Sequence, residues 1–128
     1  MTSPPSRECT HLYKILTPQE HNALPQRAWK GTEFDQNDGF IHLSTSTQLR
    51  ATLSRFFADT TEVVLVCIPR EKLERHDAGE LKFELAPSVG DEFGHIYGTI
   101  EPQHFLWTRA VHQADGSWEE SRLGELPF

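Results

Sequence analysis

The stretch Gly39-Phe40-Ile41-His42-Leu43-Ser44 decides how this sequence is expected to fold. It is a short strand that runs directly into the polar start of a helix. Because side chains alternate across a strand, the aliphatic residues of the stretch are expected on the core face, and His42 and Ser44 on the other. A histidine and a hydroxyl beside the free N–H groups of a helix start mark a candidate site for a ligand or for proton transfer.

Length and composition indicate one soluble globular domain. The chain has 128 residues, of which 37% are hydrophobic and 24% charged, values typical of a folded protein. Its net charge of −7 disfavours general nucleic-acid binding and anionic membranes, because an acidic surface repels phosphate groups. We expect a small-molecule partner and predict nothing about the oligomeric state.

The remaining composition points to the cytoplasm. Two cysteines, Cys9 and Cys67, are too few for a disulfide scaffold, which indicates a reducing compartment. No apolar run reaches the roughly 20 residues of a membrane span. The N-terminus lacks the apolar region of a secretory signal. We therefore expect a cytoplasmic protein.

Hydrophobic periodicity predicts an α+β domain. Segments that alternate or are rich in β-branched residues are predicted as strands, and 62–68 is expected to be central and buried on both faces. Regular strand–helix alternation is absent after residue 68, which favours a mixed or antiparallel, split β-sheet core over a doubly wound fold. Besides the opening stretch, the predicted strands are 11–16, 62–68, 81–85, 95–100 and 105–111.

Two main helices are predicted, with the caps that the sequence offers. Thr17-Pro18-Gln19-Glu20 reads as a capping box with proline at the first helical position. A stripe of apolar residues at helical spacing marks a second helix from Leu49 to Phe57, capped by Ser44 or Ser46. Residues 70–75 are expected to form one helical turn, and 87–94 an acidic turn.

The chain divides into three expected parts. Residues 1–10 are predicted to be a flexible tail, since proline and serine build no core there. Residues 11–112 form the domain. Residues 113–128 are expected to be a C-terminal hairpin or tail, because Asp115-Gly116 is a tight-turn dipeptide.

Polar residues inside apolar strands are the candidates for chemistry, because the glycine-rich nucleotide loops, the GxSxG and HExxH motifs and CxxC pairs are absent. His42 can orient a ligand or act as a general base, or it can simply bond a backbone carbonyl. Glu84 can stabilise a cationic, oxocarbenium-like transition state, or it can pair with Lys82 or Lys14 at the surface.

Three further residues are predicted to contact a ligand. Ser44 can bind it at the helix start, or act only as an N-cap. His95 and Tyr97 project from one strand face and can line a pocket, although Tyr97 is equally consistent with a half-buried core residue. Trp29 lies in a loop ahead of the site. No metal is expected, because the histidines and carboxylates lack close ligand spacing.

The motifs together resemble a known family. Leu-Tyr-Lys-Ile near the start, Trp29, Gly-Phe-Ile-His-Leu-Ser, Lys-Phe-Glu and His-Ile-Tyr-Gly are similar to the DUF952 family of small uncharacterised proteins, over roughly residues 11–108. Gly94 stands where that family usually has proline. The family is grouped with the ADP-ribosyltransferase-like fold, so the resemblance implies a split sheet whose cleft holds NAD in active relatives.

The resemblance also implies roles for single residues. His42 fits the residue that holds the ribose, and Tyr97 the aromatic residue that packs on nicotinamide. The late acidic residue of active relatives has no clear counterpart, because Glu84 comes early and Glu101 has no supporting context. We therefore expect NAD or an ADP-ribose-type nucleotide as ligand, with ribosyl transfer or NAD cleavage as the chemistry. The alternatives are a non-catalytic small-molecule-binding module and a protein-interaction adaptor.

Overall fold

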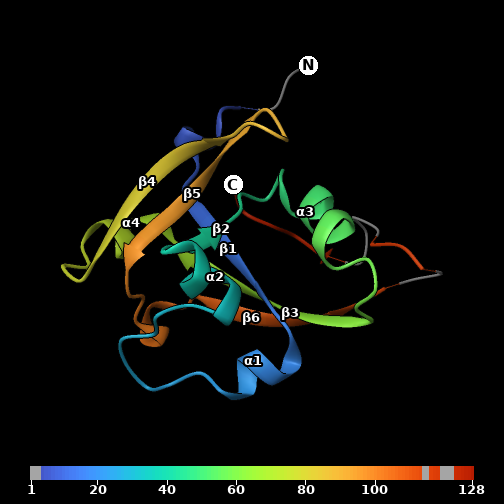
Figure 1. Ribbon diagram of the computed structural model, residues 1–128, viewed down its shortest axis with the longest axis horizontal. Helices are drawn as coiled ribbons and strands as arrows, with labels where there is room; N and C mark the ends of the chain where they lie inside the picture. The colour runs from blue at the N-terminus through green and yellow to red at the C-terminus, as the bar shows by residue number, and fades with distance from the viewer. Residues whose placement is uncertain (1–3, 114–115, 119–122) are drawn as a thin grey trace.

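The protein folds into two three-stranded antiparallel sheets with short helices around them (Figure 1). The computed structural model describes residues 4–113, 116–118 and 123–128. The strands are β1 (His11–Leu16), β2 (Ile41–Leu43), β3 (Glu62–Pro69), β4 (Gly79–Ala86), β5 (Asp91–Gly98) and β6 (Trp107–His112). The helices are α1 (Pro18–Asn22), α2 (Glu33–Asp38), α3 (Leu49–Phe56) and α4 (Arg70–Glu74), with 3₁₀ turns η1 (Ser6–Glu8) and η2 (Pro102–His104).

The strand order is β1-β3-β6 in the first sheet and β2-β5-β4 in the second. The sheets meet where Tyr13 and Ser44 exchange backbone hydrogen bonds of 2.7 and 2.9 Å. The predicted α+β class and the antiparallel, split sheet are therefore confirmed. The helix predicted from Leu49 to Phe57 is α3, which ends one residue earlier, and the helix predicted after the Thr17 capping box is the five-residue α1.

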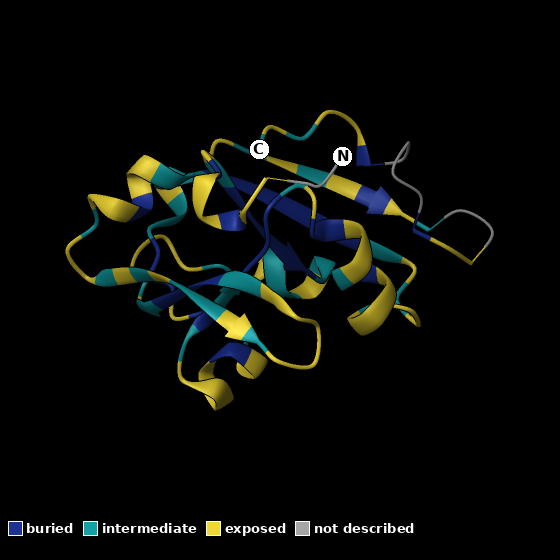
Figure 2. Ribbon diagram, turned by 90° about the horizontal axis from the view of Figure 1, so that it is seen from above, coloured by how far each residue is buried: buried dark blue, intermediate teal, exposed yellow. Residues whose placement is uncertain are grey.

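Two strands of the first sheet, β1 and β3, are buried on both faces, as predicted for β3, whose residues Val63 to Ile68 are all buried. Leu12 and Leu16 of β1 join a core cluster between the sheets, whereas Tyr13 and Ile15 join a second cluster beneath α3. This division follows from the alternation of β1 and places the core on both sides of one sheet. Figure 2 shows these buried strands inside a largely exposed shell of helices and turns.

Two predictions about the β4–β5 hairpin were wrong. The segment 87–94 is not all turn, because β5 begins at Asp91 and Glu84 pairs with Phe93. Leu85 was expected to point inward with Leu81 and Phe83, but it is 60% exposed. The inward face of β4 ends at Phe83, because Leu81 and Phe83 pack against the core cluster between the sheets and Leu85 does not.

The start of α3 also differs from prediction. Its N-cap is Gln48, whose side chain makes no capping bond to the helix. Ser44 is instead buried against Thr52, with 3.5 Å between their hydroxyl oxygens. A Thr45–Gln48 turn separates β2 from the helix, so the strand does not run directly into it.

The chain ends are packed onto the domain. The carbonyl of Phe128 accepts hydrogen bonds from the amides of Thr10 and His11 at 2.6 and 2.9 Å. Trp118 is buried and donates its indole N–H to the carbonyl of Phe57 at 3.0 Å. The predicted Asp115-Gly116 turn lies partly outside the described residues. In the described part of the chain, no helix has the length and apolar character needed to cross a bilayer.

Candidate functional site

The site is built on α2, a helix that the sequence analysis treated as loop. Thr32 and Asp35 form a capping box, in which the Asp35 amide donates to the Thr32 hydroxyl (3.2 Å) and the Thr32 amide to the Asp35 carboxylate (2.9 Å). The helix ends at Gly39, whose φ of 86° lies in the left-handed region that glycine adopts at no cost. The chain then reverses into β2, which brings His42 back over Asp35.

Asp35 is fully buried and is the centre of a charged network. Lys14 of β1 lies 2.9 and 2.7 Å from its two carboxylate oxygens, and the His42 amide donates to it at 3.2 Å. Burial opposes ionisation, but the hydrogen bond from His42 and the charge of Lys14 outweigh it and hold the pKa of Asp35 at about 2. Burial lowers the pKa of Lys14, which Asp35 partly offsets. Asp35 is therefore ionised at neutral pH.

His42 lies between two carboxylates of the same helix. Its Nδ1 is 2.6 Å from Oδ1 of Asp35 and its Nε2 is 2.9 Å from Oδ2 of Asp38. A neutral imidazole has one N–H, so both contacts are hydrogen bonds only when both ring nitrogens carry a proton. Asp35 is buried and fixes the ring, whereas Asp38 is 42% exposed. The Nε2 side is therefore the one that a ligand can reach.

His95 lies directly opposite His42, since β2 and β5 pair in that register. Its Nδ1 is 2.8 Å from Oε1 of Glu84, and the same oxygen accepts the Tyr97 hydroxyl at 2.6 Å. Burial lowers the pKa of His95; the bond to Glu84 raises it, and nearby His42 lowers it further. The hydrogen bonds from Tyr97 and His95 lower the pKa of Glu84. His95 is thus a neutral imidazole that donates from Nδ1 and leaves Nε2 unprotonated.

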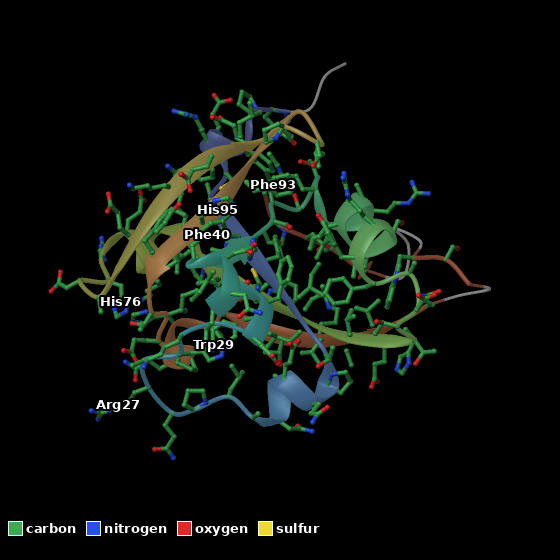
Figure 3. The ribbon with its side chains drawn as sticks, in the orientation of Figure 1. Arg27, Trp29, Phe40, His76, Phe93 and His95 are labelled. Atoms are coloured by element: carbon green, nitrogen blue, oxygen red, sulfur yellow. The ribbon has the colours of Figure 1, made fainter. Side chains whose placement is uncertain are left out.

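Aromatic rings enclose the two histidines. Phe40 stacks on His95 with 4.1 Å between ring centroids and packs on His42 at 4.7 Å. Phe34 covers His42 from another side at 4.9 Å. The two imidazoles are edge to face, with 5.5 Å between their centroids. Figure 3 shows Phe93, His95 and Phe40 gathered over β5 and β2.

A cleft of about 500 Å³ opens beside these rings. Its floor holds His42, Ser44 and His95, and its walls are phenylalanines from α2, α3 and β5 together with the β4–β5 turn. The size falls within the range of small-molecule sites. The charged residues and aromatic wall residues of the cleft are Lys14, Glu20, Asp35, Asp38, Phe34, Phe56, Phe57 and Phe93.

The structure brings together only some of the predicted site residues. His42, Ser44 and His95 line the cleft. Glu84 and Tyr97 do not line it. Glu84 bonds His95, and Tyr97 bonds Glu84 and packs on Phe40 with 5.3 Å between ring centroids.

Trp29 does not line the cleft but an adjoining open cavity of about 710 Å³, which Arg27 also lines and which shares Thr17, Glu20 and Thr32 with the cleft. It is 7% exposed, and its backbone pairs with Ile100. Figure 3 shows both Trp29 and Arg27 apart from His95.

Sequence reasoning missed Asp35, Asp38 and the role of Lys14. One signal was present, because Thr32-x-x-Asp35 has the spacing of a capping box. A second signal was Lys14, which lies on the apolar side of a strand, because a buried ammonium requires a buried acidic partner. Among the described residues, no group of three or more His, Cys, Asp or Glu side chains has the arrangement of a metal site.

Comparison with known proteins places this geometry in a family. The model of the "Protein of unknown function (DUF952)" family matches residues 14–108. The chain belongs to the DUF952 family. The match includes His42, His95 and the strands that carry them.

Solved relatives have the same fold. The crystal structure of protein CC0527 from Caulobacter crescentus is 31% identical, with a TM-score of 0.73 over 84% of this chain and 92% of that one. The solution NMR structure of CC0527 gives a TM-score of 0.70 and covers 90% of that chain. No curated protein matches the sequence. These relatives do not support the ADP-ribosyltransferase-like assignment, so DUF952 membership and the α+β fold are what the comparisons establish.

Proposed function

We infer that this DUF952 protein binds a ribosylated nucleotide of the NAD or ADP-ribose class, with the nucleoside end in the cleft. The observation that carries this is His42, whose ring is fixed by buried Asp35 while its Nε2 side faces a cleft lined by phenylalanines. A ring held in this way can bond a ribose hydroxyl, and the phenylalanines offer faces on which a flat base can stack.

The charges of the cleft also favour binding of the ligand with its nucleoside end inside. Lys14 is the only lysine or arginine among the residues that line it, and its ammonium is already bonded to Asp35 and to the His42 carbonyl. A diphosphate inside the cleft would have no free cationic partner there. The nucleoside end therefore lies inside, and the phosphates extend towards solvent.

Under this proposal the carboxylate that assists catalysis is Asp38 and not Glu84. Glu84 does not line the cleft, whereas Asp38 lines it and bonds His42. Ribosyl transfer or NAD cleavage would then rely on Asp38 for stabilising positive charge on the sugar. The position of Glu84 equally favours the second candidate, a module that binds the nucleotide without turning it over.

The adaptor alternative is weaker. An adaptor would need exposed aromatic side chains such as Trp107 and Trp118, but Trp118 is 2% exposed and Trp107 packs partly against the core. The exposed aromatic side chains of this face are instead Phe34 and Phe56, which line the cleft. An apolar cleft mouth is consistent with a small-molecule site.

Thermal unfolding with NAD, ADP-ribose, nicotinamide riboside and nicotinamide tests the proposal. A ligand at 100 times its Kd stabilises by about 2.7 kcal/mol, which raises the midpoint by several degrees in a domain of this size. His42→Ala is expected to abolish the shift. His112→Ala, which removes an exposed histidine paired with Glu62 far along β6, is the matched control. If none of the ligands stabilises the wild type, the proposal is wrong.

A further inference from the structure

We propose that His42 and His95 act as a general acid and a general base that hydrolyse the N-glycosidic bond of a nucleoside bound in the cleft. This inference rests on the proposed function, because it takes the same cleft as the site of a ribosylated ligand. It adds a second histidine to the chemistry and names the reaction and the substrate class.

The two histidines are built alike. They are paired across adjacent strands, and each ring has a carboxylate on Nδ1, Asp35 at 2.6 Å for His42 and Glu84 at 2.8 Å for His95. A carboxylate on one ring nitrogen fixes the orientation of the ring and the tautomer, as in catalytic triads. Two imidazoles 5.5 Å apart, both lining one cleft, can contact the same small substrate.

The two rings have different surroundings. His42 has a carboxylate oxygen within hydrogen-bond distance of each ring nitrogen, Asp35 at 2.6 Å and Asp38 at 2.9 Å. His95 is buried, stacks on Phe40 and lies beside His42, so it is neutral. No described residue bonds its Nε2. His42 thus has proton acceptors beside it to which it can donate, whereas Nε2 of His95 is free to accept a proton, and acid–base catalysis requires this division of roles.

The cleft favours an N-glycoside over a phosphate ester or a carboxylate ester. It has three carboxylates, Glu20, Asp35 and Asp38, against one lysine that is fully engaged. Such a surface disfavours a negative charge inside the cleft and stabilises the positive charge that develops on ribose when the base departs. The phenylalanine walls provide the stacking surface for a neutral base.

The step balances without any further reactant. The Nε2 of His95 takes a proton from a water molecule, whose oxygen forms a bond to C1′ of the ribose. The C1′–N bond breaks, and its electron pair goes to the nitrogen of the departing base, which receives the proton from Nε2 of His42. The products are ribose and the free base, and a proton passes from His95 back to His42 through solvent to complete the cycle.

Asp38 acts through His42. It accepts a hydrogen bond from Nε2 of His42, and on substrate binding the leaving base replaces Asp38 as the acceptor.

Glu84 is a positioning residue for His95, and its role can be recognised from the pH dependence of the rate. The charged and titratable groups that act on His95 are Glu84, His42 and Asp38, and Lys82 lies opposite it in the β4–β5 register. Removing the Glu84 charge removes a cause that raises the pKa of His95, so the acid limb of the rate profile is expected at lower pH.

The test is incubation of the intact protein with inosine, adenosine, uridine and cytidine, with free base measured by chromatography and ribose by a reducing-sugar assay. Wild type is expected to release base and ribose in equal amounts from at least one nucleoside, and more slowly from its 5′-monophosphate. His42→Asn and His95→Asn are each expected to lower the rate about 100-fold or more. Glu84→Gln should shift the acid limb of the pH profile, and His112→Ala should match wild type.

The failures of the two proposals are distinguishable. Thermal stabilisation by a nucleoside without release of base overturns the acid–base inference and leaves the binding site intact. Full activity in both asparagine variants also overturns it, once circular dichroism shows that the variants are folded. Absence of both stabilisation and release, with every nucleoside and with NAD and ADP-ribose, refutes the proposed function and the inference together.

Discussion

Replacing Asp35 with asparagine is the sharpest test of the network that positions His42. The change keeps the shape of the side chain and removes its charge. In the structure the carboxylate bonds Lys14 through both oxygens, His42 through Nδ1 and backbone N–H, and the Thr32 amide. Lys14 is 6% exposed, so its ammonium would remain buried with no carboxylate beside it.

The expected loss follows from that burial. Removing one partner of a buried ion pair costs about 3–5 kcal/mol, because the other charge stays uncompensated. Urea unfolding of Asp35→Asn, followed by far-UV circular dichroism, measures the loss. The loss should shrink as pH rises from 7 towards 9. Without Asp35 the pKa of Lys14 falls further below its ordinary value of 10.5, and the uncharged amine is easier to bury.

Two controls separate charge from shape. Asp38→Asn changes a carboxylate of the same helix that is 42% exposed, and it is expected to cost no more than about 1 kcal/mol. Adding Lys14→Met to Asp35→Asn removes the stranded ammonium and should recover about 2 kcal/mol. The reasoning is refuted if Asp35→Asn costs less than about 1 kcal/mol, or if the double variant is no more stable than the single one.

Other expectations follow from the same contacts. Thr32→Ala removes the N-cap bond of α2 and should lower the free energy of unfolding by about 1 kcal/mol, which urea titration measures; no change would mean that the capping box is dispensable. In NMR titrations the pKa of His95 should lie below its ordinary value of 6.5, and Glu84→Gln should lower it further; an increase in the variant would contradict the assigned hydrogen bond. The pKa of Asp35 is about 2 when folded against 3.8 when unfolded. Its ionised form therefore adds about 2 kcal/mol to the free energy of unfolding, a contribution that is complete above pH 4 and lost as pH falls towards 2. Asp35→Asn should flatten the acid side of a plot of unfolding free energy against pH. Gly98 has a φ of 130°, and a Cβ there would clash with the Ala78 carbonyl oxygen, so Gly98→Ala should unfold at a lower temperature than the wild type. The unfolding temperature should fall less in Gly90→Ala, where a Cβ meets no atom within 4 Å.

Much of the fold was predictable from local patterns. β1 was predicted with the limits that the structure gives it. Its residues alternate in polarity, and the capping box with Pro18 marks the start of α1 directly after it. β3 was predictable because a run of β-branched residues that is apolar on both faces fits a central strand. Failures occurred where tertiary contacts decide, as in the β4–β5 hairpin, where Leu85 alternates correctly but has no core beneath it.

The site was only half predictable for the same reason. His42 and His95 stood out as polar residues within strands, but their register across β2 and β5 is a long-range pairing that periodicity does not encode. Asp35 was missed because a six-residue helix gives too short a pattern to detect. Glu84 was correctly singled out as unusual in a strand. That Glu84 lies outside the cleft could not be predicted, because its position is set by tertiary hydrogen bonds from His95 and Tyr97 on the neighbouring strand.

The burial of Asp35 limits how this protein can change its ligand, in evolution or in the laboratory. Lys14, Asp35 and His42 connect β1, α2 and β2, so the same bonds hold the domain together and aim the imidazole. A mutant library directed at this triad would lose folded protein before it yielded new specificity. Phe34 and Phe56, more than half exposed at the cleft mouth, carry little of the core. Diversity introduced at those two positions would leave the folded scaffold intact and offer the more productive route to altered recognition.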